Sequence, residues 1–165
     1  MIVRVIIKNL YSFNNEVEFN TLPWRISRLG HQKYNRLKID VLKLSAIYGA
    51  NGAGKSNLIK TISLLRNFVI TGSIPNEIKT EKFKLKGNNN DLSTEIGIEF
   101  ITNEIAYYYA VEIDNIRILS EVLFKSGLGN KDDELVFQRS TDPNGKVSIK
   151  FNNEFEKFKT DFSQA

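Results

Sequence analysis

The eight residues from Gly49 to Ser56 constrain the fold of this chain more than any other stretch. They read GANGAGKS and match the pattern G-x-x-x-x-G-K-[ST] at every specified position. A short, mostly apolar run precedes them at 44–48 and is expected to form a buried strand. Apolar residues recur at helical spacing after them, from Lys55 to about Val69. This order of strand, glycine-rich loop and helix predicts an α/β fold built around a phosphate-binding loop.

The residue types in this loop suit the binding of a nucleoside triphosphate. Phosphate oxygens can lie against backbone N–H groups only where no side chain intervenes, which favours glycine at Gly52 and Gly54. The Lys55 ammonium can reach the β- and γ-phosphates and is the expected catalytic group, and the Ser56 hydroxyl can ligate Mg²⁺. The residues expected to contact the nucleotide are Gly49, Ala50, Asn51, Gly52, Ala53, Gly54, Lys55, Ser56 and Asn57. The alternative is a glycine-rich turn that precedes Lys-Ser by chance.

Two further segments imitate GTPase motifs, one of which, N-K-x-D, reads guanine. Asn130–Asp133 reads NKDD and fits N-K-x-D, and Asp142–Gly145 reads DPNG and fits D-x-x-G. Their order along the chain is the reverse of the usual GTPase order. Both consist of residues that are common in hairpin turns. We therefore interpret both segments as turns, which disfavours a GTPase.

The remainder of the chain divides into a hairpin, a basic segment, a polar loop and a strand-rich region. Residues 2–19 alternate as strands do, with Val3, Val5 and Ile7 on one face. Residues 25–43 carry six cations against the single acid Asp40, and Thr71–Pro75 is expected to end the helix. The strands expected beyond the polar loop at 76–93 are 95–101, 105–113, 116–124, 135–139 and 146–151, with turns at 114–115 and 142–145.

All 165 residues are expected to form one domain, with 1–75 as the hairpin, loop and helix, 76–93 as a polar loop and 94–151 as antiparallel strands. Residues 152–165 place three phenylalanines on one helical face and reach Ala165 without a cap, so we expect a truncated helix. The absence of cysteine excludes disulfides and thiolate-bound zinc. No stretch approaches the roughly 20 apolar residues of a membrane span, so a cytoplasmic protein without a membrane partner is expected.

The chain resembles the ABC-type ATPases of the SMC, RecF and OLD group, including the AAA-family ATPases of bacterial anti-phage systems. The resemblance rests on IKNLYSFNNEVEF at 7–19, on YGANGAGKSN at 48–57 and on the strand sequences YYYAVEIDNIRILSEVLF and ELVFQR. It implies the N-terminal lobe of an ATPase head with ATP and Mg²⁺ as ligands. It also implies head-to-head dimerisation with a second copy, and a nuclease or toxin partner or DNA as further possibilities.

The sequence departs from this family at one position and leaves several of its motifs unaccounted for. The family commonly has Arg or Lys where this chain has Tyr11, so Tyr11, Phe13 and Trp24 are alternative candidates for stacking on adenine. The signature motif, the strand ending in Asp-Glu and the switch histidine belong to a second half of the ATPase. Asp114 could imitate the acidic end of that strand, but a turn is favoured for it, and Gln138 could imitate the glutamine loop, but a strand position is favoured. His31 precedes the phosphate loop, so it cannot be the switch histidine.

Three functional readings therefore remain open at the level of the sequence. The first is an ATPase whose full-length form hydrolyses ATP, while this portion alone is expected to be inactive. The second is a nucleotide-gated scaffold with little hydrolysis. The third is a phosphate-loop kinase, which is disfavoured by the hairpin before the loop and by the strands after the helix. The basic segment 25–43 interleaves Trp24 and Tyr34 with cations, a pattern that suits either a nucleic-acid backbone or a solvated face.

Overall fold

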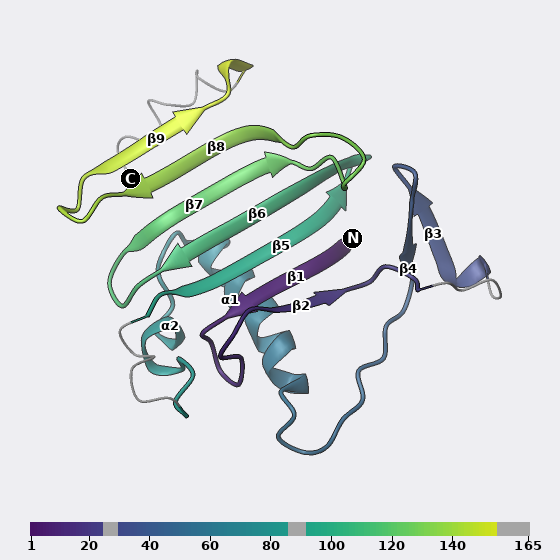
Figure 1. Ribbon diagram of the computed structural model, residues 1–165, viewed down its shortest axis with the longest axis horizontal. Coiled ribbons are helices and arrows are strands. Elements are labelled where there is room, and N and C mark those ends of the chain that lie inside the picture. The colour runs from purple at the N-terminus through teal and green to yellow at the C-terminus, as the bar shows by residue number, and fades with distance from the viewer. Residues whose placement is uncertain (25–29, 86–91, 155–165) are drawn as a thin grey trace.

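The computed structural model describes residues 1–24, 30–85 and 92–154, and its central feature is a large antiparallel sheet with one long helix on one face (Figure 1). The strands are β1 Ile2–Lys8, β2 Val17–Asn20, β3 Lys33–Arg36, β4 Ile39–Leu42, β5 Thr94–Thr102, β6 Ile105–Ile113, β7 Ile118–Lys125, β8 Glu134–Thr141 and β9 Val147–Phe151. The helices are α1 Lys55–Thr71 and α2 Glu77–Thr80, with a 3-10 turn at Gly30–Gln32.

The large sheet has seven strands in the order β2-β1-β5-β6-β7-β8-β9, and every neighbouring pair is antiparallel. The predicted N-terminal hairpin is confirmed as β1 and β2, and the predicted strand meander is confirmed as β5 to β9. What the sequence pattern did not reveal is that β1 also pairs with β5, which joins the hairpin and the meander into one sheet. The third strand of the meander begins at Ile118 rather than at Ile116, which lies exposed in the preceding turn.

Helix α1 and the large sheet together form the main hydrophobic core. Its residues Leu58, Leu64, Leu65 and Phe68 pack with Val5, Ile7 and Ile96, and with further strand residues, in one buried cluster. The prediction that Val3, Val5 and Ile7 share one face of β1 is confirmed, because side chains alternate across a strand and all three are almost completely buried. The helix ends as predicted at Gly72, whose left-handed φ of 66° allows its N–H to bond the Phe68 carbonyl.

The prediction of a buried strand at 44–48 is wrong. These residues form an extended segment that pairs with no strand in the described part of the chain, and the side chains of Leu44 and Tyr48 are 77% and 89% exposed. A short apolar run becomes a buried strand only where neighbouring strands satisfy its backbone and further layers cover both faces. Neither is provided here, so the apolar run leads into the glycine-rich loop as an exposed connection.

The polar loop predicted at 76–93 contains a short helix that the composition did not suggest. Helix α2 anchors this segment through Ile78, which is completely buried in the main core. Residues 86–91 of the loop lie outside the described residues, as do residues 155–165, where a terminal helix was expected. In the described parts of the chain, no helix is long and apolar enough to cross a membrane.

The basic segment 25–43 contains a second, two-stranded sheet that was not predicted. Strands β3 and β4 pair from Lys33↔Leu42 to Arg36↔Ile39, and Leu37 and Lys38 between them have positive φ values of 50° and 67°. Two consecutive positive φ values form the tight turn whose twist suits a hairpin, although Leu and Lys are unusual in it. Val41 of this hairpin is fully buried in a second small core with Val3, Ile101 and Ala106.

Candidate functional site

The glycine-rich loop 49–54 connects the exposed segment 44–48 to the first turn of α1. Gly52 and Gly54 have φ values of 83° and 88°, in the left-handed region that favours glycine. A Cβ atom added to Gly52 would meet no atom within 4 Å, so the space over this part of the loop is open. The α1 N-terminus has no side-chain cap, which leaves the first backbone N–H groups of the helix without that partner. The loop therefore has the open backbone and the helix terminus that a phosphate group requires.

Lys55 is the first residue of α1, and its side chain folds back over the loop. Its ammonium nitrogen Nζ donates hydrogen bonds to the carbonyl oxygens of Gly49 and Ala50, both at 2.7 Å. These bonds hold the cation at the mouth of the loop, where it can exchange carbonyl partners for phosphate oxygens. Ser56 follows on the exposed first turn of the helix, where its hydroxyl can take part in binding a metal ion.

The turn between β1 and β2 contacts this loop, a feature that sequence reasoning missed. The Asn57 side-chain amide Nδ2 donates a hydrogen bond to the Ser12 hydroxyl oxygen at 3.0 Å. A Cβ atom added to Gly54 would lie 2.6 Å from the same Ser12 oxygen and 3.6 Å from the Phe13 ring. No local pattern in the sequence reports this contact, because it joins residues 45 positions apart.

The three aromatic residues considered for adenine stacking occupy different environments. Tyr11 and Phe13 are partly buried and pack against the main core, and Phe13 lies beside Gly54. Burial raises the pKa of the Tyr11 hydroxyl, as do Glu77 and Glu81, and the Lys60 ammonium lies 5.8 Å from the centre of its ring. Trp24 is 82% exposed. Of the three, the structure brings only the Tyr11–Phe13 turn to the phosphate loop.

The residues that could imitate the second half of an ATPase lie in turns and strands of the meander. Asp114 caps the β6–β7 turn: its Oδ1 accepts hydrogen bonds from the backbone N–H groups of Ile116 and Arg117, and its Oδ2 accepts one from the Arg117 side chain. Burial by itself would raise the pKa of the Asp114 carboxyl, but these hydrogen bonds together hold it below its ordinary value. Gln138 lies within β8, as expected, and His31 is exposed in the 3-10 turn.

The two GTPase-like segments are also turns, as the sequence indicated. Residues 130–133 belong to the loop between β7 and β8, where Asp133 accepts a hydrogen bond from the Gly127 amide. Residues 142–145 form the β8–β9 turn, in which the Gly145 N–H bonds the Asp142 carbonyl and Gly145 has a φ of 84°. The carboxylates of both segments are thus used to stabilise turns.

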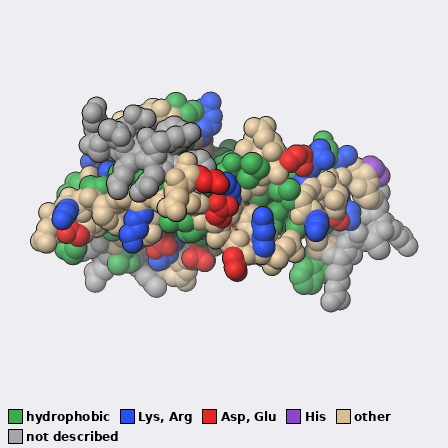
Figure 2. All heavy atoms as spheres, turned by 90° about the horizontal axis from the view of Figure 1, so that it is seen from above, with side chains coloured by type: hydrophobic (Ala, Val, Ile, Leu, Met, Phe, Trp, Pro, Cys, Tyr) green, Lys and Arg blue, Asp and Glu red, His purple; other side chains and the backbone are tan. Residues whose placement is uncertain are grey.

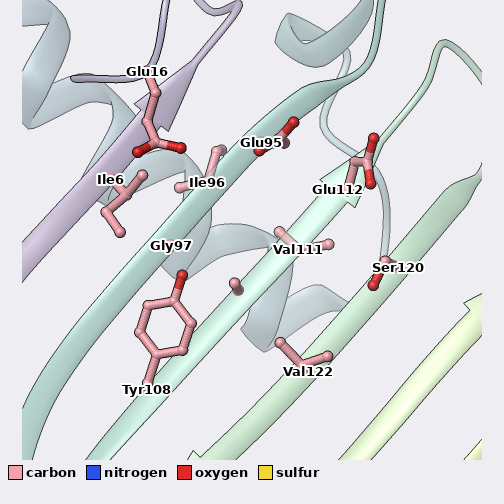
Figure 3. A pocket seen from close by; sticks show the side chains of 11 residues that line it. Ile6, Glu16, Glu95, Ile96, Gly97, Tyr108, Val111, Glu112, Ser120 and Val122 are labelled. Atoms are coloured by element: carbon pink, nitrogen blue, oxygen red, sulfur yellow. The ribbon is translucent and has the colours of Figure 1, made fainter. Parts of the chain in front are cut away.

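The sheet face opposite α1 carries a shallow hollow of about 210 Å³ that is separate from the phosphate loop (Figure 3). Its floor includes Gly97, over which the Tyr108 ring leans, and Glu16, Glu95 and Glu112 stand around it. Glu95 is paired with Lys8, and Glu112 accepts a hydrogen bond from Ser93. Within the described residues, no group of three or more His, Asp or Glu side chains could hold a metal ion, and this hollow is no exception.

A glycine-rich G-x-x-x-x-G-K-S loop that opens a helix packed on a sheet defines the P-loop class of nucleotide-binding domains. The fold, an antiparallel sheet with few helices, fits an α/β P-loop NTPase-like domain. The chain belongs to the family described as "AAA domain, putative AbiEii toxin, Type IV TA system", whose model matches residues 44–165. No curated protein matches the chain. Membership of this family makes the chain a nucleotide-binding, ATPase-like domain.

Proposed function

We propose that this domain binds ATP together with Mg²⁺ at residues 49–57. The observation that carries the proposal is the geometry of the loop: two left-handed glycines leave the backbone open at an uncapped helix N-terminus, and the Lys55 ammonium lies over it. The backbone N–H groups and the helix dipole would hold the phosphates, Lys55 would contact the β- and γ-phosphates, and Ser56 would ligate the metal. Mg²⁺ bound at Ser56 would supply positive charge to neutralise charge on the phosphoryl group.

We further propose that the domain is the N-terminal lobe of an ABC-type ATPase of the SMC, RecF and OLD group. Support comes from the resemblance of 7–19 to the opening hairpin of that group, and from the way this hairpin continues into the strand meander through the β1–β5 pairing. The turn of the same hairpin contacts the phosphate loop through Ser12. The full-length ATPase would hydrolyse ATP, would dimerise head to head with a second copy and would act with a toxin or nuclease partner. Of this, the family description supports only the toxin–antitoxin or defence setting.

The second candidate is a nucleotide-gated scaffold that binds ATP and seldom hydrolyses it. What favours it is that Asp114, the acidic residue considered for catalysis, instead caps the β6–β7 turn. Steady-state phosphate release by the full-length protein separates the two candidates. Sustained turnover supports the ATPase, whereas tight binding of ATP that remains intact supports the scaffold.

A DNA-binding role for the basic segment has weaker support. Figure 2 shows several Lys and Arg side chains near the single histidine, at the end of the molecule where the β3–β4 hairpin lies. Two cations of the β3–β4 hairpin have acidic partners, since Lys33 pairs with Asp40 at 2.7 Å and Arg36 with Glu104 at 3.4 Å. The Lys43 ammonium lies 4.6 Å from the centre of the Tyr34 ring. These contacts favour a solvated, internally paired surface over one prepared for phosphates.

The experiment that tests the nucleotide site is equilibrium binding of ATP by the parent protein and by Lys55→Ala. Loss of the charge-assisted contacts, each worth about 1.5–3 kcal/mol, should weaken ATP binding at least tenfold. Lys150→Ala, which removes an exposed lysine on the edge strand β9, is the matched control and should bind as the parent does. Equal ATP affinity in the parent and Lys55→Ala would overturn the assignment.

A further inference from the structure

A hydrogen bond joins the β1–β2 turn to the first turn of α1, directly after the phosphate loop. The Ser12 hydroxyl oxygen accepts a hydrogen bond from Asn57 Nδ2 at 3.0 Å. A hydroxyl has two lone pairs and one hydrogen, and only a lone pair is used by Asn57. In the described part of the chain, the Ser12 hydroxyl donates to no acceptor, although its side chain is exposed and lies against Gly54.

We propose that Ser12 is a further nucleotide-binding residue, whose hydroxyl donates a hydrogen bond to a phosphate oxygen of the bound nucleotide while Asn57 fixes its orientation. This inference rests on the proposed nucleotide site at 49–57. It adds Ser12, which lies 37 residues before Gly49 and 45 before Asn57, so the β1–β2 turn would line the site on one side.

The local backbone explains why Ser12 can lie so close to the loop. The turn is held by hydrogen bonds between Leu10 and Phe13 in both directions, and the Tyr11 N–H bonds the Glu81 carbonyl beside α2. Tyr11 takes a left-handed φ of 53°, and the rings of Tyr11 and Phe13 pack against the core. The turn is therefore fixed from both sides, so that the Ser12 side chain, rather than a mobile loop tip, faces the phosphate loop.

Gly54 provides the complementary half of the contact. A Cβ atom there would come within 2.6 Å of the Ser12 oxygen, so the glycine leaves room for the hydroxyl. The hydroxyl thus lies beside the loop residue immediately before Lys55, whose ammonium bonds the carbonyls of Gly49 and Ala50 in the same loop. A donor in this place adds to the backbone N–H groups without adding a charge.

The test compares Ser12→Ala, Asn57→Ala and the double variant with the parent, measuring the dissociation constants of ATP and of inorganic triphosphate. Ser12→Ala should weaken both ligands about tenfold, the effect of one hydrogen bond to a charged group. Asn57→Ala should weaken them by less, and the double variant should lose little more than Ser12→Ala alone, because the two residues act through one hydroxyl. Ser148→Ala, an exposed serine on β9, is the control.

Three results would overturn the proposal. Unchanged affinity in Ser12→Ala would do so, provided that Lys55→Ala still weakens binding. Weakened binding of ATP but not of inorganic triphosphate would place the contact on the nucleoside rather than on a phosphate. A lowered melting temperature of Ser12→Ala without nucleotide, with unchanged nucleotide affinity, would show that Ser12 only packs. Failure of Lys55→Ala to weaken binding would instead contradict the nucleotide site as a whole.

Discussion

Replacement of Gly54 by alanine tests the packing of the β1–β2 turn against the phosphate loop. Two separate costs arise at this position. The left-handed φ of 88° opposes any L side chain by about 1–2 kcal/mol. In addition, the new Cβ would overlap the Ser12 oxygen at 2.6 Å, which forces Ser12 aside and breaks its hydrogen bond with Asn57, a further loss of about 1 kcal/mol.

Gly72 at the other end of α1 separates these two costs. It has a similar φ of 66°, but a Cβ atom added there would meet nothing within 4 Å. Gly72→Ala should therefore carry only the backbone cost, and Gly54→Ala should be about 1 kcal/mol less stable than Gly72→Ala. In a domain of this size, that difference corresponds to a melting temperature about 2–4 °C lower.

The assay is thermal unfolding without nucleotide of the parent, Gly54→Ala, Gly72→Ala and the double variant Gly54→Ala/Ser12→Ala. The double variant should be about as stable as Gly54→Ala, because the hydrogen bond between Ser12 and Asn57 is already lost in Gly54→Ala. Equal melting temperatures for Gly54→Ala and Gly72→Ala would refute the close approach of Ser12 to the loop. So would a double variant that is less stable than Gly54→Ala alone.

Three further predictions concern the Asp114 turn, the proposed metal ligand Ser56 and the β3–β4 hairpin. Asp114→Ala should lower the melting temperature at pH 7, because the hydrogen bonds that depress the Asp114 pKa stabilise the fold at pH values above the unfolded pKa of 3.8. The difference from the parent should shrink as the pH falls through the folded pKa. A difference that persists in acid would contradict this role. Ser56→Ala should abolish the strengthening of ATP binding by Mg²⁺ while leaving binding in chelator almost unchanged, and a normal Mg²⁺ titration would exclude Ser56 as the ligand. Replacing Lys33 and Arg36 by glutamine should leave the salt dependence of DNA binding by the full-length protein unchanged, since both cations are paired with acids. If the slope of log binding constant against log salt concentration becomes smaller by about 2, the two cations contact phosphates instead.

The sequence was most informative where a local pattern determines the structure. The left-handed glycines, the helix from Lys55 and its end at Gly72 follow from residue types within one or two turns of each other. The strands of the meander follow from alternation and from turn residues such as those at 142–145. The turn roles of Asp114 and of residues 130–133 were likewise predicted from their position between strands.

What depended on distant partners could not be predicted. The apolar run 44–48 reads as a buried strand, but burial requires partner strands and covering layers that the run itself does not specify. The pairing of β1 with β5 and the contact of Ser12 with Asn57 join segments that are far apart in the chain and carry no local signal. The β3–β4 hairpin was hidden because its turn uses Leu37 and Lys38 in place of the usual Asn and Gly.

Amide hydrogen exchange of the phosphate loop, with and without Mg·ATP, tests the central claim most directly. In the free protein, the loop is exposed and the α1 N-terminus is uncapped, so its amides from Gly52 to Ser56 should exchange quickly. If phosphates lie against these N–H groups, Mg·ATP should slow exchange there in the parent, and Lys55→Ala should need at least tenfold more ATP for the same protection. Unchanged exchange at 52–56 under saturating Mg·ATP, or protection confined to the hollow around Gly97, would contradict the account.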